Sequence, residues 1–212
     1  MQIITGSTGD KHVTSADDGE FNRAIYGDAL TILPIGNKLG ATIVDNNTVR
    51  INDGDLVFYG RHARIRKGST ESLKITSGEA GKKRTDLIVA RYELNSSTGY
   101  ESMTLVVKKG TATTGTPADP AITSGNIANG ATKAEAILYR VNIDGITIKS
   151  VTRVATLPSN TVMSRLASVE TKASSADNKV TNQLGSLSIK AMTASEYSAL
   201  ATKDSNTIYL TY

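Results

Sequence analysis

A run of apolar residues at heptad spacing limits most strongly what this chain can fold into. From Val162 to Gln183 the spacing alternates between four and three residues without a break, and mostly polar residues lie between. A seam this narrow is typical of a coiled coil, whereas a helix packed on its own domain usually carries a wider apolar face. The predicted oligomerisation positions are Val162, Leu166, Val169, Ala173, Ala176, Val180 and Gln183.

The seam also indicates how many chains associate. Val162 and Val169 occupy position d and Leu166 occupies position a, which places β-branched residues where parallel dimers prefer Leu and so favours three chains. The alternative is an amphipathic helix that lies on the β-rich domain. A buried Val or Leu contributes about 1.5–3 kcal/mol, so a few of them per chain cannot hold a trimer against association entropy. The regions on either side must therefore share the interface.

Residues 1–157 alternate apolar and polar positions with a period of two, between frequent turn residues. This pattern predicts short strands joined by hairpins, in an antiparallel β-sandwich or barrel-like domain. We expect hairpin turns at residues 46–47, 96–99 and 144–145, with positive φ at 46–47. The Asn-Asp-Gly sequence at 52–54 predicts a further turn, which would make Asp53 and Asp55 turn residues.

Two segments interrupt the strand pattern. Residues 14–27 predict a short helix that Ser15 caps, with Phe21, Ala24 and Ile25 on one face. Residues 110–133 form a long polar loop. A loop of this length in a compact domain is usually functional or packed on another molecule, and we expect packing on a neighbour.

The chain after the β-rich domain divides into two further parts. Pro158 ends the domain, and Ser159 or Asn160 can cap a stem helix over residues 158–185. Residues 186–212 predict a strand, a helix with a capping box at 193–196, and a final strand. Such a short segment cannot bury a stable core alone, so it needs copies from sister chains. The residues predicted to form this oligomeric tip are Tyr197, Leu200, Ile208, Tyr209 and Leu210.

The predicted fold class is therefore mainly β. It combines the sandwich or barrel-like N-terminal domain of residues 1–157 with a trimeric coiled-coil stem of residues 158–185 and a small α/β tip of residues 186–212. No apolar run is long enough to span a bilayer and no signal peptide is recognisable, which predicts a soluble chain without membrane insertion.

Composition excludes several kinds of chemistry. The chain has no Cys, so disulfides, thiolate metal sites and catalytic Cys are excluded, and the net charge of +4 is mild. Basic residues gather at 61–67, as a strand with a solvated basic face, and at 82–84, without the dense stripe expected for nucleic-acid binding. A metal site formed by His12, Asp17, Asp18 and His62 has suitable ligand types, but nothing in the sequence brings the two His together. No cofactor or catalytic motif is found, and we expect no enzyme.

Several segments of the chain carry a resemblance to known proteins. They are residues 14–18, 37–42, 47–51, 53–56, 60–65, 84–92 and 138–141. These segments resemble the N-terminal domain of tail fibre or baseplate proteins from phages and prophages of Gram-positive bacteria. The ending, residues 192–197 with 206–209, resembles a short module that recurs in phage tail proteins. The resemblance implies a virion component whose N-terminal domain docks on the tail while the stem carries what lies beyond.

Three features together predict a structural protein of a phage tail: the heptad seam, the short C-terminal segment and the resemblance. It would be a homotrimer assembled in the host cytoplasm, with other tail or baseplate proteins as partners. The alternative is a lectin-like protein that binds host cell-wall saccharide through its tip or through residues 110–133. An enzyme that cuts surface glycans is a third candidate, which no motif supports.

Overall fold

The computed structural model describes residue 4 and residues 13–157, 162–185 and 187–212. The chain divides into two compact units, residues 1–159 and residues 160–212. It is mainly β, with antiparallel sheets that form a half-barrel, as the alternating pattern predicted. The predicted helix cap at Ser159 or Asn160 and the predicted break at Pro158 lie outside the described residues.

The first sheet of the N-terminal unit is organised around one long central strand. Its strands are β1 (Thr31–Ile32), β2 (Ala41–Asp45), β3 (Thr48–Phe58) and β4 (Arg61–Lys74). Strand β3 pairs with β4 on one edge, and on its other edge with β2 near one end and β1 near the other, all antiparallel. The sheet is thus widest around β3, whose residues are mostly buried.

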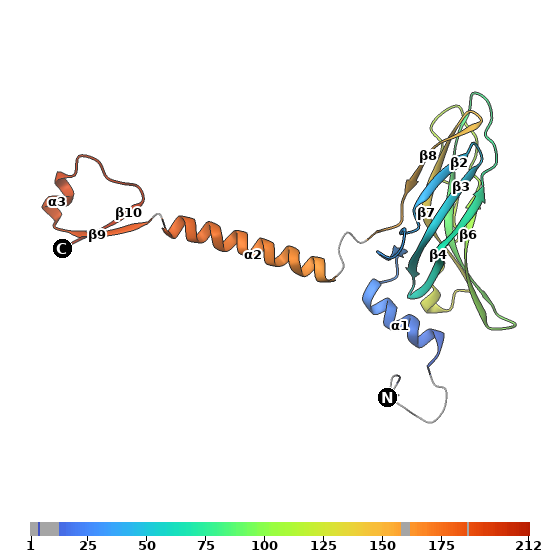
Figure 1. Ribbon diagram of the computed structural model, residues 1–212, viewed down its shortest axis with the longest axis horizontal. Coiled ribbons are helices and arrows are strands. Elements are labelled where there is room, and N and C mark those ends of the chain that lie inside the picture. Colours follow the sequence, from blue (N-terminus) through green and yellow to red (C-terminus); the bar gives the residue numbers. More distant parts are fainter. Residues whose placement is uncertain (1–3, 5–12, 158–161, 186) are drawn as a thin grey trace. The chain divides into compact units, whose positions relative to one another are not determined.

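The second sheet is a four-stranded antiparallel sheet in the order β6-β5-β7-β8. Its strands are β5 (Lys83–Asn95), β6 (Tyr100–Lys108), β7 (Lys133–Asp144) and β8 (Thr147–Arg153). The hairpins predicted at 96–99 and 144–145 are confirmed, and each uses a glycine with positive φ, 72° at Gly99 and 60° at Gly145. Figure 1 shows the two sheets packed face to face.

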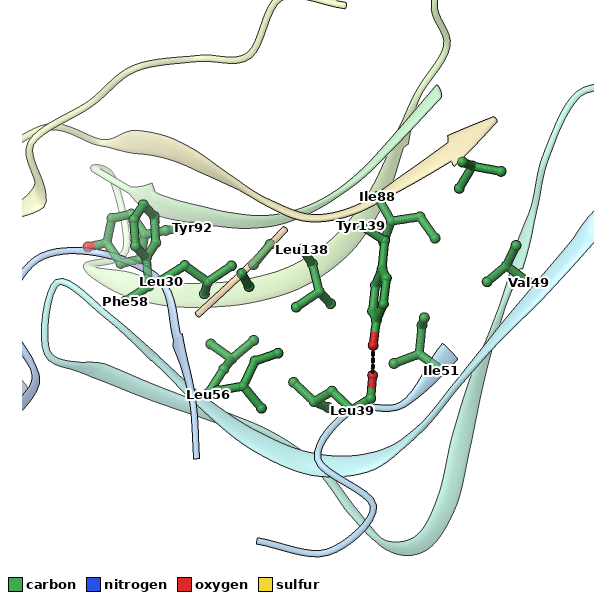
Figure 2. Packing of buried hydrophobic residues seen from close by; sticks show 14 of the residues in the cluster. Leu30, Leu39, Val49, Ile51, Leu56, Phe58, Ile88, Tyr92, Leu138 and Tyr139 are labelled. Carbon is green, nitrogen blue, oxygen red and sulfur yellow. Dashed lines mark hydrogen bonds between the residues drawn. The ribbon is translucent and has the colours of Figure 1, made fainter. Parts of the chain in front are cut away.

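The core of this unit lies between the two sheets (Figure 2). Apolar side chains of β3 and of the segments beside it meet those of β5 and β7. The labelled members are Leu30, Leu39, Val49, Ile51, Leu56, Phe58, Ile88, Tyr92, Leu138 and Tyr139. One polar contact crosses this core, because the Tyr139 hydroxyl donates a hydrogen bond of 2.7 Å to the Leu39 carbonyl. The unit therefore has a core of its own.

The turn predicted at residues 52–54 is wrong. Strand β3 continues through this segment, and the register with β4 shifts between Asn52 and Gly54, as at a β-bulge. Asp53 and Asp55 are buried strand residues, 5% and 8% exposed, rather than turn residues. Pairing with β4 overrides the local turn preference, and Gly54, with φ 152°, lies so close to the Leu39 amide that a side chain there would overlap it.

Two smaller expectations about chain geometry are corrected. The turn at residues 46–47 is present, but neither Asn has positive φ. Instead the Asp45 carboxylate accepts hydrogen bonds from the Asn47 amide and the Thr48 hydroxyl. The predicted helix is α1 (Ser15–Tyr26), and its N-cap is Thr14 in a capping box with Asp17, so Ser15 is the first helical residue rather than the cap.

Buried ion pairs show that the basic segments are not continuous basic surfaces. Arg84 is 2% exposed and donates to Asp86, which is fully buried, at 2.7 Å. The 82–84 segment therefore contributes no arginine to the surface. In β4, Arg64 and Arg66 are exposed as predicted, but Arg61 turns inward and pairs with Glu101 at 2.9 Å.

The loop between β6 and β7 is anchored to its own unit. The Gly110 amide donates to Asp86 at 2.8 Å, and the Thr123 amide donates to Glu135 at 2.7 Å. Near its end, the short helix η1 (Ile127–Asn129) buries Ile127 in the core. Packing of this loop on a neighbouring molecule stays a prediction.

The C-terminal unit contains one long helix and a small β-α-β element. Its members are α2 (Val162–Gly185), β9 (Ser188–Met192), α3 (Ala194–Ala199) and β10 (Thr207–Thr211). The helix expected over the seam is present, as are the capping box of Thr193 with Glu196 and both predicted strands. Among the described helices, none is long and apolar enough to cross a membrane.

An uncovered apolar face in the C-terminal unit

The two strands of the C-terminal unit pair in parallel, and their register decides which side chains share a face. Ile208 lies opposite Ile189, and Leu210 lies opposite Ala191. Because alternate residues of a strand point to opposite sides, these four apolar residues project from one side of the sheet. We call Ile189, Ala191, Ile208 and Leu210 the tip face.

The opposite side of this sheet is covered by α3. Tyr209, on β10, packs its ring against Tyr197 of α3 with 5.3 Å between the ring centroids. The Lys203 ammonium lies over the Tyr197 ring, 4.7 Å from its centroid, and the Tyr209 hydroxyl accepts a hydrogen bond from the Asp204 amide. These contacts close one side of the sheet and leave the tip face as its other side.

Within the described residues of the C-terminal unit, nothing covers the tip face. Ile189 is 69% exposed, Ile208 48% and Leu210 55%, and Leu187 and Tyr212 beside them are 41% and 83% exposed. None of residues 187–212 is buried. Burying one such Ile or Leu contributes about 1.5–3 kcal/mol, and a two-stranded sheet alone is at best marginally stable. The element therefore needs a partner surface to be stable.

The same residues are the ones that match a known protein family. Residues 187–212 match the phage tail tip domain. The match supports a phage tail structural protein and a virion component, and with it interaction with other phage tail proteins. No curated protein matches the chain.

The predicted tip residues fall on different sides of the tip domain. Ile208 and Leu210 belong to the tip face, whereas Tyr197 and Tyr209 pack on the α3 side and Leu200 is the C-cap of α3. The prediction missed Ile189 and Ala191. Their alternation in β9 was visible in the sequence, but only the parallel register assigns them to the same face as Ile208.

The helix that precedes the tip domain also carries uncovered apolar residues. Val169 is 62% exposed and Val180 53%, and Ala173 and Ala176 are exposed as well, so no described side chain of the C-terminal unit covers these seam positions. The side chains of Val162, Leu166 and Gln183 lie outside the described part of the chain. The coiled coil itself stays a prediction.

The described residues hold no group of three or more His, Asp or Glu side chains placed to bind a metal ion. In the metal site considered from the sequence, His12 lies outside the described residues, and the Asp17 carboxylate takes part in the capping box of α1. The His62 ring nitrogen Nε2 lies 2.6 Å from the Asp55 carboxylate, which is a structural contact within the first sheet.

Proposed function

We propose that this chain is a homotrimeric fibre or baseplate component of a phage tail. Its N-terminal unit docks on the tail, and its stem and tip domain project for host attachment or carry another tail protein. The chain would act without catalysis, after assembly in the host cytoplasm. The tip face is the observation that carries this proposal, because it is apolar, exposed and part of the segment that matches the phage tail tip domain.

Two features support self-association over capture of an unrelated protein. The seam of α2 repeats its apolar positions at 3.5-residue spacing, the spacing by which identical helices wind around each other. It leads into the tip face within a few residues, so both uncovered surfaces lie in one short stretch of chain. β-branched residues at position d favour three chains.

Light scattering of the whole chain at micromolar concentration tests the trimer. We expect a mass three times that of the monomer. Val169→Asp would place three carboxylates in the seam and weaken association at least about tenfold, because unpaired buried charges are costly. Ser174→Asp is the matched control, since Ser174 is exposed on the same helix outside the seam. A monomer mass, or equal effects of both substitutions, would contradict association through the seam.

The second candidate is a lectin-like protein that binds host cell-wall saccharide through the tip domain or residues 110–133. The favouring observation is Tyr212, whose ring is 83% exposed, because aromatic faces suit sugar rings. A glycan array and binding to purified host cell walls separate the candidates. Saturable binding lost in Tyr212→Ala supports the lectin, whereas no binding, with co-purification of other tail proteins, supports the structural role. Turnover of wall polysaccharide would contradict both.

A further inference from the structure

Helix α1 is attached to the N-terminal unit through its polar and small side. Gly19 is its buried residue and lies against the turn between β3 and β4. A side chain on Gly60 would overlap the Gly19 carbonyl, and one on Gly19 would overlap the Arg61 guanidinium. The two glycines therefore permit a close approach of the helix backbone to the sheet.

A half-buried carboxylate fastens the start of the helix. Glu101 of β6 accepts hydrogen bonds from Arg61 at 2.9 Å, from the Tyr92 hydroxyl at 2.7 Å and from the Ser15 hydroxyl at 2.9 Å. Arg61 also donates to the Ser15 carbonyl at 3.2 Å. Burial and the hydrogen bond to Glu101 raise the pKa of Tyr92 to about 12, so its hydroxyl remains a donor. These polar contacts determine which side of α1 faces inward.

The apolar side of α1 consequently faces outward. Phe21 is 71% exposed and Ile25, one turn later, is 54% exposed, with Ala24 exposed beside them. An amphipathic helix on a globular unit normally buries this stripe and exposes its polar side. Phe21, Ala24 and Ile25, which we call the α1 ridge, are thus placed as an interaction surface.

An open apolar groove lies near the same end of the unit. It has a volume of about 790 Å³ and is lined by side chains that include Leu30, Phe58, Tyr59, Ile122, Ile137 and Val154. The groove begins at Asp28, directly after α1, and Val154 at its rim is 37% exposed. In Figure 1, α1 lies across the end of the unit toward which β8 runs.

This end is also where the chain leaves toward the stem. Thr156 bridges to Thr31 of β1, beside the groove. In the sequence, only four residues separate Leu157 from Val162, the start of α2. If three stems associate, the groove ends of three N-terminal units are held at a high effective concentration.

We propose that the α1 ridge of each chain packs into the groove of the next chain in the same trimer. This inference rests on the proposed trimer. Ridge and groove are different surfaces of one unit, so the contact is heterologous and closes after three copies around the stem axis. Both surfaces are apolar, and their tethering near the stem favours a second copy over a separate tail protein as the occupant.

Thiol labelling of the full chain tests the contact, because the chain has no natural Cys. Ala24→Cys places a small thiol within the ridge while Phe21 and Ile25 remain. Ile146→Cys is the control, since Ile146 is 60% exposed on the β7–β8 hairpin. We expect a maleimide to react at least about tenfold more slowly at position 24 than at position 146 in the native protein, and equally in denaturant.

Further variants identify the occupant. Val154→Arg, which charges the groove rim, should restore fast labelling at position 24 in a protein that still has the trimer mass. Equal labelling of positions 24 and 146 in a trimer would overturn the inference and leave the proposed function intact, whereas a monomer mass would overturn both. Slow labelling that becomes fast when residues 2–12 are deleted would overturn the inference, because the chain's own N-terminal segment would then cover the α1 ridge. Slow labelling that survives Val154→Arg would overturn the groove as the site.

Discussion

The two units of this chain differ in how they obtain a hydrophobic core. The N-terminal unit buries the facing sides of two sheets and satisfies charged groups inside it, such as the pair of Arg84 and Asp86. The C-terminal unit, in its described residues 187–212, buries nothing and exposes a complete sheet face. The first unit can therefore fold as a single chain, whereas under the proposed trimer we expect the second to depend on other copies. Stability of the first should be independent of concentration, and that of the second should rise with it.

The largest effect is expected from a charge on the tip face. Ile208→Asp would bury a carboxylate among apolar side chains in every copy, and three such carboxylates at about 2 kcal/mol or more each would weaken association about ten-thousandfold or more. Lys190→Asp, on the opposite side of the same sheet, is the control and should leave the mass unchanged. Light scattering measures the mass and circular dichroism the melting of the N-terminal unit. If Ile208→Asp also lowered the melting temperature of the N-terminal unit, the two units would not be independent in stability.

The next effect concerns the buried ion pair. Asp86→Ala leaves the Arg84 guanidinium buried without its carboxylate and removes the acceptor of the Gly110 amide. Breaking a buried pair in this way costs about 3–5 kcal/mol, which urea unfolding of the N-terminal unit would measure. Asp119→Ala breaks the exposed pair with Arg140 and should cost less than about 1 kcal/mol. Equal losses in both variants would contradict the role of burial.

Acid pH should lower the stability of the N-terminal unit through one buried carboxylate. Burial alone would raise the pKa of Glu135 above its ordinary value of 4.5. Hydrogen bonds from the Thr123 amide, Lys108 and Arg91 outweigh burial and lower the pKa to about 2. Because the folded-state pKa is depressed, this contribution is complete above about pH 4.5 and is lost as the pH falls toward 2. It amounts to roughly 3 kcal/mol in urea unfolding of the N-terminal unit.

Variants identify the responsible carboxylate. Glu135→Gln should be less stable than the natural sequence at neutral pH, and its loss of stability between pH 4.5 and 2 should be smaller by roughly 3 kcal/mol. Glu93→Gln is the control, because Glu93 is half-exposed in its pair with Lys133. If Glu135→Gln retained the acid sensitivity of the natural sequence, another group would be responsible.

The smallest effect concerns the hydrogen bond across the core. Tyr139→Phe leaves the Leu39 carbonyl without its donor and should cost about 1 kcal/mol in unfolding of the N-terminal unit. Tyr100→Phe, at a ring that is 77% exposed, should change nothing measurable. If Tyr139→Phe left the free energy of unfolding unchanged, water would replace the missing hydroxyl as the donor.

Local features of the sequence predicted local structure well. Turn glycines at 99 and 145, the capping box at Thr193 and the apolar alternation of the strands each act within a few residues, and the structure contains the expected hairpins, helix start and strands. The heptad lies in the stem helix predicted over residues 158–185, and the structure describes α2 over Val162–Gly185, while the trimer stays a prediction.

Features that depend on distant partners were not predictable in this way. The segment at 52–54 has the composition of a turn, but β4 pairs across it. The sequence placed the apolar residues of α1 on one face, but it did not show that Glu101, 86 residues from Ser15, turns the polar side inward. The tip face could be identified only from the register between β9 and β10, and the sequence alone does not determine that register.

The anchoring of the β6–β7 loop has a practical consequence. Two buried carboxylates, Asp86 and Glu135, hold the amides of Gly110 and Thr123, and the Thr113 backbone pairs with Lys83 of β5, so the loop is fixed to the second sheet on both sides of residue 115. Gly115 and its exposed neighbours lie between the two anchors. Lengthening a surface loop costs little entropy, which makes this position suitable for inserting an epitope or a fluorescent label into the assembled particle.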